Sequence, residues 1–267
     1  MNGWTFDPDL PIAKVAQRVA DAGFDTFEPV LGNAGALRID SDEQTLRDAG
    51  KTIRSAGLEV SALATGLFWQ ESCAATDPEE RERAMEIAVA MLDRARWIGA
   101  PTILMIPAVV GRASDPVPRI AYADALAGAA RALHTLGFEA ERRGVSIAVE
   151  NVWNRFLLSP VEMRELIDRV NSPWVGVYFD VGNVLPFGYP QDWIETLGQR
   201  IKRVHVKDFK LDVGTKAGFC PPGDGDVNWP AVMAALQAIH YEGPLVYEGP
   251  GDPNDIAARI DRACGTA

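Results

Sequence analysis

Short apolar runs alternate with longer segments whose apolar residues recur at helical spacing. The runs have the length of buried strands, and the longer segments carry helix signals such as the capping box formed by Ser159 and Glu162. The predicted strands are residues 4–6, 24–28, 58–63, 102–106, 145–150, 175–179, 201–204 and 245–248. The predicted helices are residues 11–22, 41–56, 77–98, 120–143, 159–171, 192–200, 229–240 and 254–264.

This alternation predicts a single (β/α)8 TIM barrel that spans residues 1–267. A doubly wound open sheet is the competing α/β architecture, but no Gly-rich phosphate turn follows the first predicted strand. The length of 267 residues suits one large α/β domain, and no linker divides the chain.

The charge and the composition of the chain limit the classes of molecule that it is expected to bind. A formal net charge of -11 opposes binding to a nucleic-acid backbone or an anionic membrane, because like charges repel. The 3 cysteines are too scattered for a disulfide framework, and no apolar run approaches the ~18 residues of a membrane span. The N-terminus has no basic start followed by an apolar run. We therefore expect a cytoplasmic protein with a small-molecule partner, and neither a nucleic acid nor a membrane.

Several predicted strands have a carboxylate or an imidazole side chain at or next to their C-terminal end. In a (β/α)8 barrel the C-terminal ends of the strands form the rim where active sites lie. Three carboxylates and one imidazole come from four consecutive strands and form a set suited to one divalent ion, Mn²⁺, Mg²⁺ or Co²⁺, with Zn²⁺ as an alternative. Any one of these acids could instead cap a helix or pair with an arginine, but four successive strand ends favour a metal site. The predicted metal ligands are Glu150, Asp180, His205 and Glu248.

Glu28 also ends a predicted strand. Its position in the strand order predicts that it lies across the barrel from the four candidate ligands. We therefore expect Glu28 to be a structural or substrate-facing acid and not a metal ligand.

Several motifs together resemble those of xylose-isomerase-like TIM barrels, the family of sugar and sugar-phosphate isomerases and epimerases that includes ketose 3-epimerases. The resemblance runs through nearly the whole chain. The motifs are Glu150-Asn151 with Asn154-Arg155-Phe156, Phe179-Asp180-Val181-Gly182-Asn183, His205-Val206-Lys207-Asp208, Gly223-Asp224-Gly225 to Trp229, and Glu248-Gly249.

This resemblance implies a divalent ion held by the four predicted ligands, with Glu150 and Glu248 also acting as catalytic acid and base. A proton next to a carbonyl is weakly acidic, so the ion would stabilise the enediolate that forms when the proton leaves. In a 3-epimerisation one carboxylate removes the proton and the other returns one on the opposite face. Which of the two acts first is not determined by the sequence.

Two positions depart from the pattern of free-ketose 3-epimerases. Where that pattern implies a further glutamate and a histidine, this chain has Phe156 and Asn183. Asn183 looks more like the sugar-phosphate members and retains the ability to hydrogen-bond a hydroxyl. The substrate-binding candidates are Asn183, Trp69, Lys207, Arg155 and Asp224.

Other functions remain open at this stage. A lyase, either a keto-inositol dehydratase or a 3-keto-glycoside eliminase, would use the same proton removal. A phosphodiesterase similar to endonuclease IV would need several metals, more than the 3 histidines present and a surface that tolerates DNA. A non-catalytic sugar-binding barrel is a further alternative. Barrels of this kind often pair through their helices, so a homo-oligomer is an alternative to a monomer.

Overall fold

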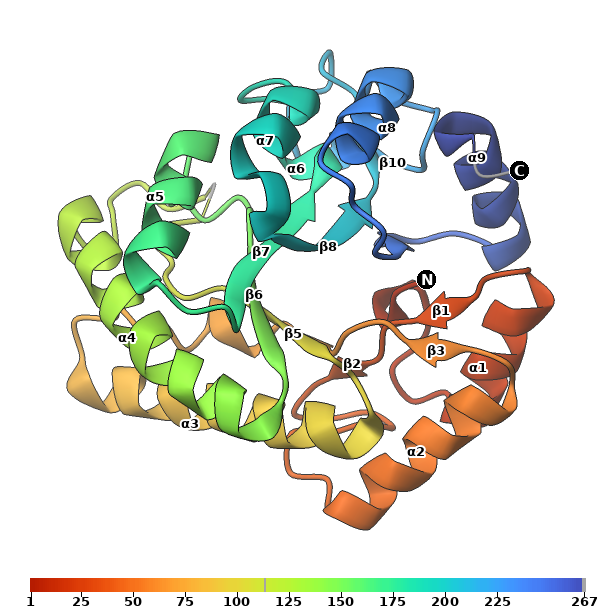
Figure 1. Ribbon diagram of the computed structural model, residues 1–267, viewed down its shortest axis with the longest axis horizontal. Helices are drawn as coiled ribbons and strands as arrows, with labels where there is room; N and C mark the ends of the chain where they lie inside the picture. Colours follow the sequence, from red (N-terminus) through yellow and green to blue (C-terminus); the bar gives the residue numbers. More distant parts are fainter. Residues whose placement is uncertain (113, 266–267) are drawn as a thin grey trace.

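A ring of helices encloses a curled set of parallel strands in the computed structural model, which describes residues 1–112 and 114–265 (Figure 1). Five strands form one continuous parallel sheet, in which hydrogen-bonded neighbours follow the order β11-β8-β7-β6-β5. These strands are β5 (Thr102–Met105), β6 (Ser146–Glu150), β7 (Val175–Asp180), β8 (Ile201–Val206) and β11 (Leu245–Tyr247). The predicted (β/α)8 barrel is confirmed.

The rest of the barrel is built from short strand pairs. Here β1 (Thr26–Phe27) pairs with β3 (Glu59–Val60), and β2 (Val30–Leu31) pairs with β4 (Ala64–Thr65). A bridge between Leu63 and Ile103 joins this part to β5. On the other side, Asn2 bridges to Glu28 and its backbone N–H donates to the Tyr247 carbonyl at 2.9 Å. These contacts close the sheet into a barrel.

The predicted first strand at residues 4–6 is wrong. The 3-10 helix η1 (Gly3–Thr5) lies there, and Asn2 supplies the first strand position instead. The Asn2 side chain accepts a hydrogen bond from the Trp4 backbone N–H at 2.7 Å, which favours a tight turn directly after the bridge.

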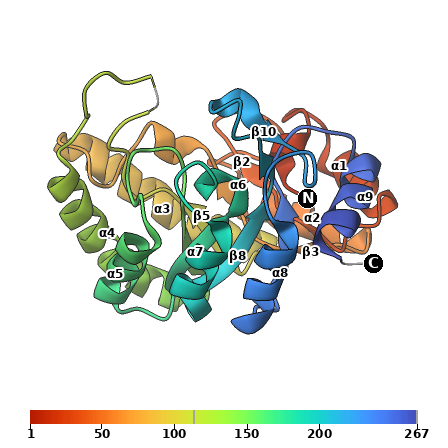
Figure 2. The same cartoon turned by 90° about the horizontal axis from the view of Figure 1, so that it is seen from above.

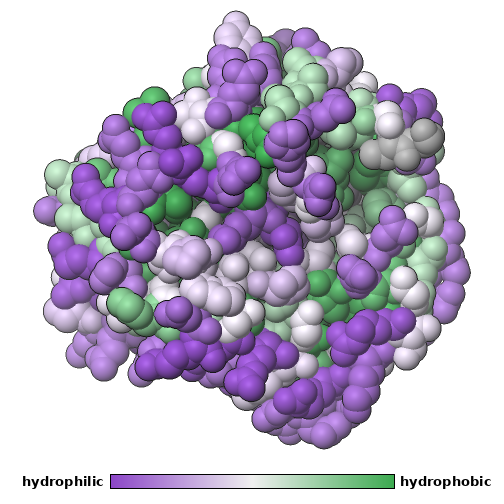
Figure 3. All heavy atoms as spheres, in the orientation of Figure 1, coloured by the Kyte–Doolittle hydropathy of each residue, from purple (hydrophilic) through white to green (hydrophobic). Residues whose placement is uncertain are grey.

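In the described part of the chain, eight longer helices surround the strands, and the periphery seen in Figure 3 is mostly hydrophilic. The predicted Ser159–Glu162 capping box is confirmed, Asp77 is the N-cap of the helix predicted to begin there, and the helix predicted to begin at residue 41 begins after the N-cap Asp42 instead. The helices are α1 (Ile12–Asp21), α2 (Glu43–Ser55), α3 (Pro78–Ile98), α4 (Tyr122–Arg143), α5 (Pro160–Val170), α7 (Pro190–Leu197), α8 (Trp229–Ala238) and α9 (Pro253–Cys264).

Smaller elements build the C-terminal rim. The turn of helix α6 (Val181–Val184) follows β7 directly, and the 3-10 helix η2 (Leu67–Trp69) follows β4. A hairpin of β9 (Asp208–Phe209) and β10 (Phe219–Cys220) follows β8, and its loop contains the 3-10 helix η4 (Lys216–Gly218). The 3-10 helix η3 (Gly198–Arg200) lies at the other end of β8, directly before the strand. The loop after β5 and this hairpin rise on the same side of the ring of helices (Figure 2).

The core lies between the strands and the inner faces of the helices. Every residue of β5 and β7 is buried. Helix α3 buries three alanines and three larger apolar residues on one side, which are Ala84, Ala88, Met91, Leu92, Ala95 and Ile98. Burial of this apolar surface is the main force that holds the barrel together. Within residues 1–112 and 114–265, no helix combines the length and the apolar character that crossing a bilayer requires.

Candidate active site

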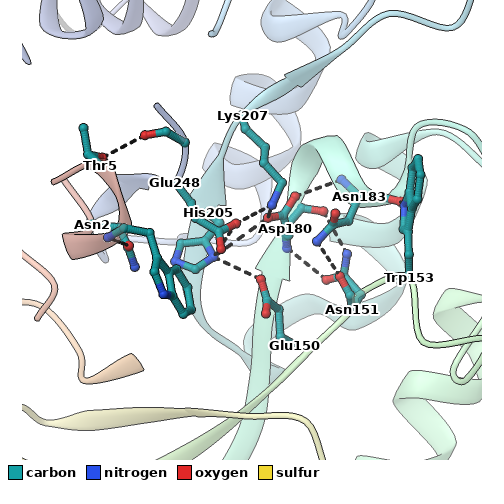
Figure 4. Close-up of polar contacts among 12 residues, drawn as sticks. Asn2, Thr5, Glu150, Asn151, Trp153, Asp180, Asn183, His205, Lys207 and Glu248 are labelled. Carbon is teal, nitrogen blue, oxygen red and sulfur yellow. Dashed lines mark hydrogen bonds and ion pairs between the residues drawn. The ribbon is translucent and has the colours of Figure 1, made fainter. Parts of the chain in front are cut away.

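Glu150, Asp180, His205 and Glu248 project toward one point at the C-terminal rim (Figure 4). Glu150 and Asp180 end β6 and β7, His205 lies in β8, and Glu248 directly follows β11. One ligand atom from each side chain lies within 4.8 Å of the ligand atoms of the other three. Since the sheet order is β11-β8-β7-β6, the two glutamates flank the aspartate and the histidine. The barrel thus brings together the four residues that the strand ends predicted.

The two ring nitrogens of His205 contact different groups. Its Nδ1 lies 3.1 Å from Glu150 Oε1, 3.8 Å from Asp180 Oδ2 and 3.7 Å from Glu248 Oε2. Its Nε2 lies 2.8 Å from Glu28 Oε2 on the opposite side. The nitrogen that faces the three carboxylates, Nδ1, is the one that could bind a metal ion, and with an ion bound there Nε2 would carry the ring proton and donate it to Glu28.

The side chain of Glu28 reaches the candidate cluster from the other side of the barrel. Glu28 is fully buried and contacts His205 directly, and it is not among the four grouped candidate ligands. The barrel closes through Asn2, which lies between Glu28 and Tyr247 of β11 and whose side-chain amide donates to Glu28 Oε2 at 2.8 Å. The contact with Nε2 suits Glu28 to hold the orientation and the tautomer of the candidate ligand His205.

Replacing Glu28 by glutamine is expected to weaken Mn²⁺ binding by about 10- to 100-fold, because the Nε2–H of His205 loses its charged acceptor. Isothermal titration of the purified variant with Mn²⁺ measures this change. The control is Glu59→Gln, which alters an exposed glutamate at the start of the neighbouring strand β3. Unchanged Mn²⁺ affinity in the Glu28 variant would refute this role.

Lys207 reaches into the same cluster (Figure 4). Its Nζ lies 2.8 Å from Asp180 Oδ2 and forms a second, shorter ion pair with Glu248. Although burial by itself would lower it, the charges of Asp180 and Glu248 raise the pKa of Lys207 above its usual range. Gly182 makes this position accessible, since a Cβ there would lie 2.8 Å from the Lys207 Cγ. Lys207 is therefore a fixed positive charge beside the candidate ligands.

The two glutamates differ in their protonation. Burial raises the pKa of Glu150 to about 7, with the charge of Glu248 adding to the effect and a hydrogen bond to His205 opposing it. For Glu248, burial also acts to raise the pKa, but the charges of Lys207 and His205 outweigh it and the pKa is lowered. Near neutral pH, Glu248 is ionised while Glu150 is poised between its two forms.

Two asparagines fix the backbone at the ends of β6 and β7. The Asn151 side chain accepts from the Asp180 backbone N–H at 2.9 Å and donates to the Asp180 carbonyl at 2.8 Å. The Asn183 side chain donates to the Asn151 carbonyl at 3.0 Å, and its backbone N–H donates to Asp180 Oδ1 at 2.8 Å. This network holds Asp180 in place, and the sequence analysis assigned no role to Asn151 although it lies in the motif with Glu150.

A cavity of about 180 Å³ opens directly at the cluster. Three of the substrate-binding candidates, Trp69, Lys207 and Asn183, line it together with Glu150 and Glu248. The sequence pattern does not predict a site role for the remaining lining residues, which are Trp4, Thr65, Leu104, Ile106, Val152, Trp153, Lys216 and Phe219. They lie in strands, loops and the short 3-10 helices η1 and η4, where no motif marks a binding position.

The other two substrate-binding candidates lie elsewhere. Arg155 is exposed and lines a neighbouring cavity of about 590 Å³. Asp224 forms an ion pair with Arg259 of α9 at 2.5 Å, and it is not among the residues that line the cavity at the cluster. The Gly-rich loop is therefore tied to the outer helix through Asp224, which does not contact this cavity.

The residues present fit a divalent ion. Three carboxylates and one imidazole nitrogen converge. The single positive charge of Lys207 cannot balance the negative charges of three ionised carboxylates. Hard oxygen donors with one imidazole are a set that divalent first-row metals and Mg²⁺ accept. Glu150, Asp180, His205 and Glu248 can therefore hold a metal ion.

Comparisons with known proteins identify the family of this barrel. The chain is 26% identical to an inosose dehydratase of Clostridium perfringens over 271 residues, which cover 91% of this chain and 89% of that protein. A solved structure of L-ribulose 3-epimerase matches 100% of this chain and 94% of its own, with a TM-score of 0.79 and 20% identity. A D-psicose 3-epimerase solved with D-fructose matches 99% and 94%, with a TM-score of 0.78 and 16% identity. The family model described as the xylose isomerase-like TIM barrel matches residues 16–264, and the chain belongs to that family.

Proposed function

We propose that the protein is a divalent-metal-dependent epimerase of a ketose or ketose phosphate that inverts carbon 3 through an enediolate. The observation that carries this proposal is the pair of carboxylates on the two flanks of the candidate metal cluster. Glu150 and Glu248 line one cavity, yet they come from β6 and from the end of β11, with β7 and β8 between them. Such a pair suits removal of a proton from one face of a substrate and its return to the other.

The chain supplies the acid and the base as follows. Glu248, held ionised beside Lys207, removes the proton next to the carbonyl. Glu150, whose pKa is raised to about 7, returns a proton from the opposite flank, and the reverse reaction exchanges these roles. A bound divalent ion would polarise the carbonyl and stabilise the negative charge that develops on its oxygen. Lys207 contributes a second positive charge at the same place.

We further propose Mn²⁺ as the ion, with Mg²⁺ or Co²⁺ as substitutes and Zn²⁺ as an alternative, because oxygen donors dominate the set. Asn183 offers its remaining N–H and its side-chain oxygen to a substrate hydroxyl, and Trp69 offers an aromatic face to the sugar. A cytoplasmic location and a homo-oligomeric state, with no nucleic-acid or membrane partner, stay predictions.

The proposal is tested by incubating Mn²⁺-loaded protein in D₂O with a panel of ketoses, ketose phosphates and keto-inositols. In D₂O we expect an epimeric product that carries one deuterium at carbon 3 and is one mass unit heavier than the substrate, and in H₂O an epimer of the same mass as the substrate. If no compound in the panel exchanges a proton under any metal tested, the proposed function is refuted.

The likeness to inosose dehydratase supports a second candidate. In a dehydratase the same proton removal is followed by loss of a hydroxyl group from the neighbouring carbon. The product is then lighter by one water, so mass spectrometry of the same reactions separates the two functions. Loss of water from a keto-inositol, with no epimer formed from any ketose, would favour the dehydratase.

A further inference from the structure

Lys216 lies in the loop of the β9–β10 hairpin and lines the same cavity as Glu150 and Glu248. Its side chain is exposed at the mouth, and its Nζ lies 5.9 Å from the centroid of the Trp69 ring. Within residues 1–112 and 114–265, no acidic side chain forms a salt bridge with it. The ammonium group of Lys216 is thus available to a ligand in the cavity.

The second cation of the cavity is not available in this way. Lys207 is committed to Asp180 and Glu248 through two ion pairs, so its charge is already balanced by candidate metal ligands. A negatively charged substrate would meet the acids of the cluster and the overall charge of -11, and both would repel it. Lys216 is the cavity residue whose charge can offset this repulsion.

The hairpin that carries Lys216 is firmly built. The buried carboxylate of Asp208 accepts hydrogen bonds from the backbone N–H groups of Phe209, Gly223 and Val227, and from the Trp229 indole, at 2.8 to 3.0 Å. A Cβ on Gly225 would lie 2.3 Å from Asp208 Oδ1, so the chain passes close to this carboxylate only because it has glycine there. Lys216 is therefore held over the cavity by a fixed scaffold.

The shape of the cavity separates two parts of a substrate. Its volume of about 180 Å³ lies below the ~300–1,000 Å³ typical of drug-sized ligands, so it suits the carbon skeleton of one monosaccharide. Trp4, Trp69, Trp153 and Phe219 form the aromatic part of its wall, and the acidic lining residues, Glu150 and Glu248, belong to the candidate metal cluster and would repel an anionic substituent placed beside them. A charged group must then lie at the mouth, where Lys216 is exposed.

We propose that Lys216 is a specificity-determining residue that binds an anionic substituent, a phosphate or a carboxylate, at the end of the sugar remote from the reacting carbon. This inference rests on the proposed function, because it names the substrate class of the same site. The inference narrows the proposed substrates to ketoses that carry an anionic substituent. It also assigns a substrate contact outside the cluster of candidate metal ligands.

The test compares Lys216→Met with the wild type on matched pairs of substrates. The pairs are L-ribulose 5-phosphate with L-ribulose, and D-fructuronate with D-fructose, all with Mn²⁺-loaded protein. The ratio of kcat/KM for the anionic over the neutral sugar is expected to fall by about 10- to 100-fold, since a hydrogen bond to a charged group is lost. We expect the effect mainly in KM. A fall for L-ribulose 5-phosphate alone assigns phosphate, and a fall for D-fructuronate alone assigns carboxylate.

Two further variants sharpen the comparison. Lys216→Arg keeps the charge and should restore most of the preference. Lys210→Met removes an exposed lysine of the same hairpin that does not line the cavity, and it should leave the ratio unchanged. A wild type that does not prefer either anionic sugar, or an equal change of the ratio in both methionine variants, overturns the proposal.

The failure of this inference is distinguishable from the failure of the proposed function. If none of the four sugars exchanges a proton, the role of Lys216 is decided by calorimetric binding of the same pairs, and the proposed function fails only when the whole panel of ketoses, ketose phosphates and keto-inositols shows no exchange. Tighter binding of the anionic sugar by the wild type, lost in Lys216→Met, supports the anion contact. Equal binding of both sugars, or the same binding by wild type and variant, refutes it.

Discussion

Replacing Glu248 by glutamine is expected to slow the uptake of solvent deuterium into the substrate by about 10²- to 10⁴-fold. Glutamine keeps the size of the side chain and one oxygen donor, but it cannot take up the proton. Glu248 is the expected base because Lys207 and His205 hold it ionised. Glu150→Gln should cause a loss of similar size in epimerisation, since the proton must be returned from the other flank.

Both variants also alter candidate metal ligands, so Mn²⁺ binding is measured separately and the exchange is followed by NMR in D₂O at saturating Mn²⁺. The control Glu242→Gln changes an exposed glutamate in the turn before β11. Exchange without epimerisation in one variant assigns that residue to the face from which the proton returns. Exchange at the wild-type rate in a Mn²⁺-loaded variant rules out the two-carboxylate assignment.

Replacing Asp208 by alanine is expected to lower the free energy of unfolding by about 3–5 kcal/mol, a value at the upper end for single substitutions. The side chain is fully buried and accepts four hydrogen bonds from the hairpin and from the start of α8. Without it, three buried donors and the more exposed N–H of Gly223 lose their acceptor, and each loss at a buried donor costs about 1–3 kcal/mol before the structure relaxes.

Urea unfolding followed by circular dichroism measures this change, and Asp212→Ala, an exposed aspartate of the same hairpin, is the control. Asp208→Asn retains one acceptor oxygen and should lose less stability than the alanine variant. If Asp208→Ala unfolds at the same urea concentration as Asp212→Ala, the four hydrogen bonds do not anchor the hairpin in solution.

The pattern of apolar residues was sufficient to predict the barrel and the position of the candidate metal ligands at its C-terminal rim. Buried strands such as β5 and β7 carry continuous apolar runs, and helix caps such as Ser159 are local signals, so both are readable along the chain. Because parallel strands end at one rim, the sequence predicts that the acids at the ends of β6 and β7 and directly after β11 lie close together. The first strand could not be predicted, since a single bridge at Asn2 leaves no periodic signal.

Tertiary structure decided which partner each side chain meets. Lys207 and Asp208 are adjacent in sequence, yet one reaches the candidate metal ligands and the other holds the hairpin, because successive residues of an extended chain point in opposite directions. Glu28 and His205 are far apart in the chain, and only closure of the barrel through Asn2 sets Glu28 Oε2 at 2.8 Å from Nε2. Sequence by itself thus determined the strands, the helices and the rim on which the chemistry lies. The contacts of Glu28, Lys207 and Lys216 depended on how distant segments pack, because hydrophobic periodicity is local and contacts across a barrel are not.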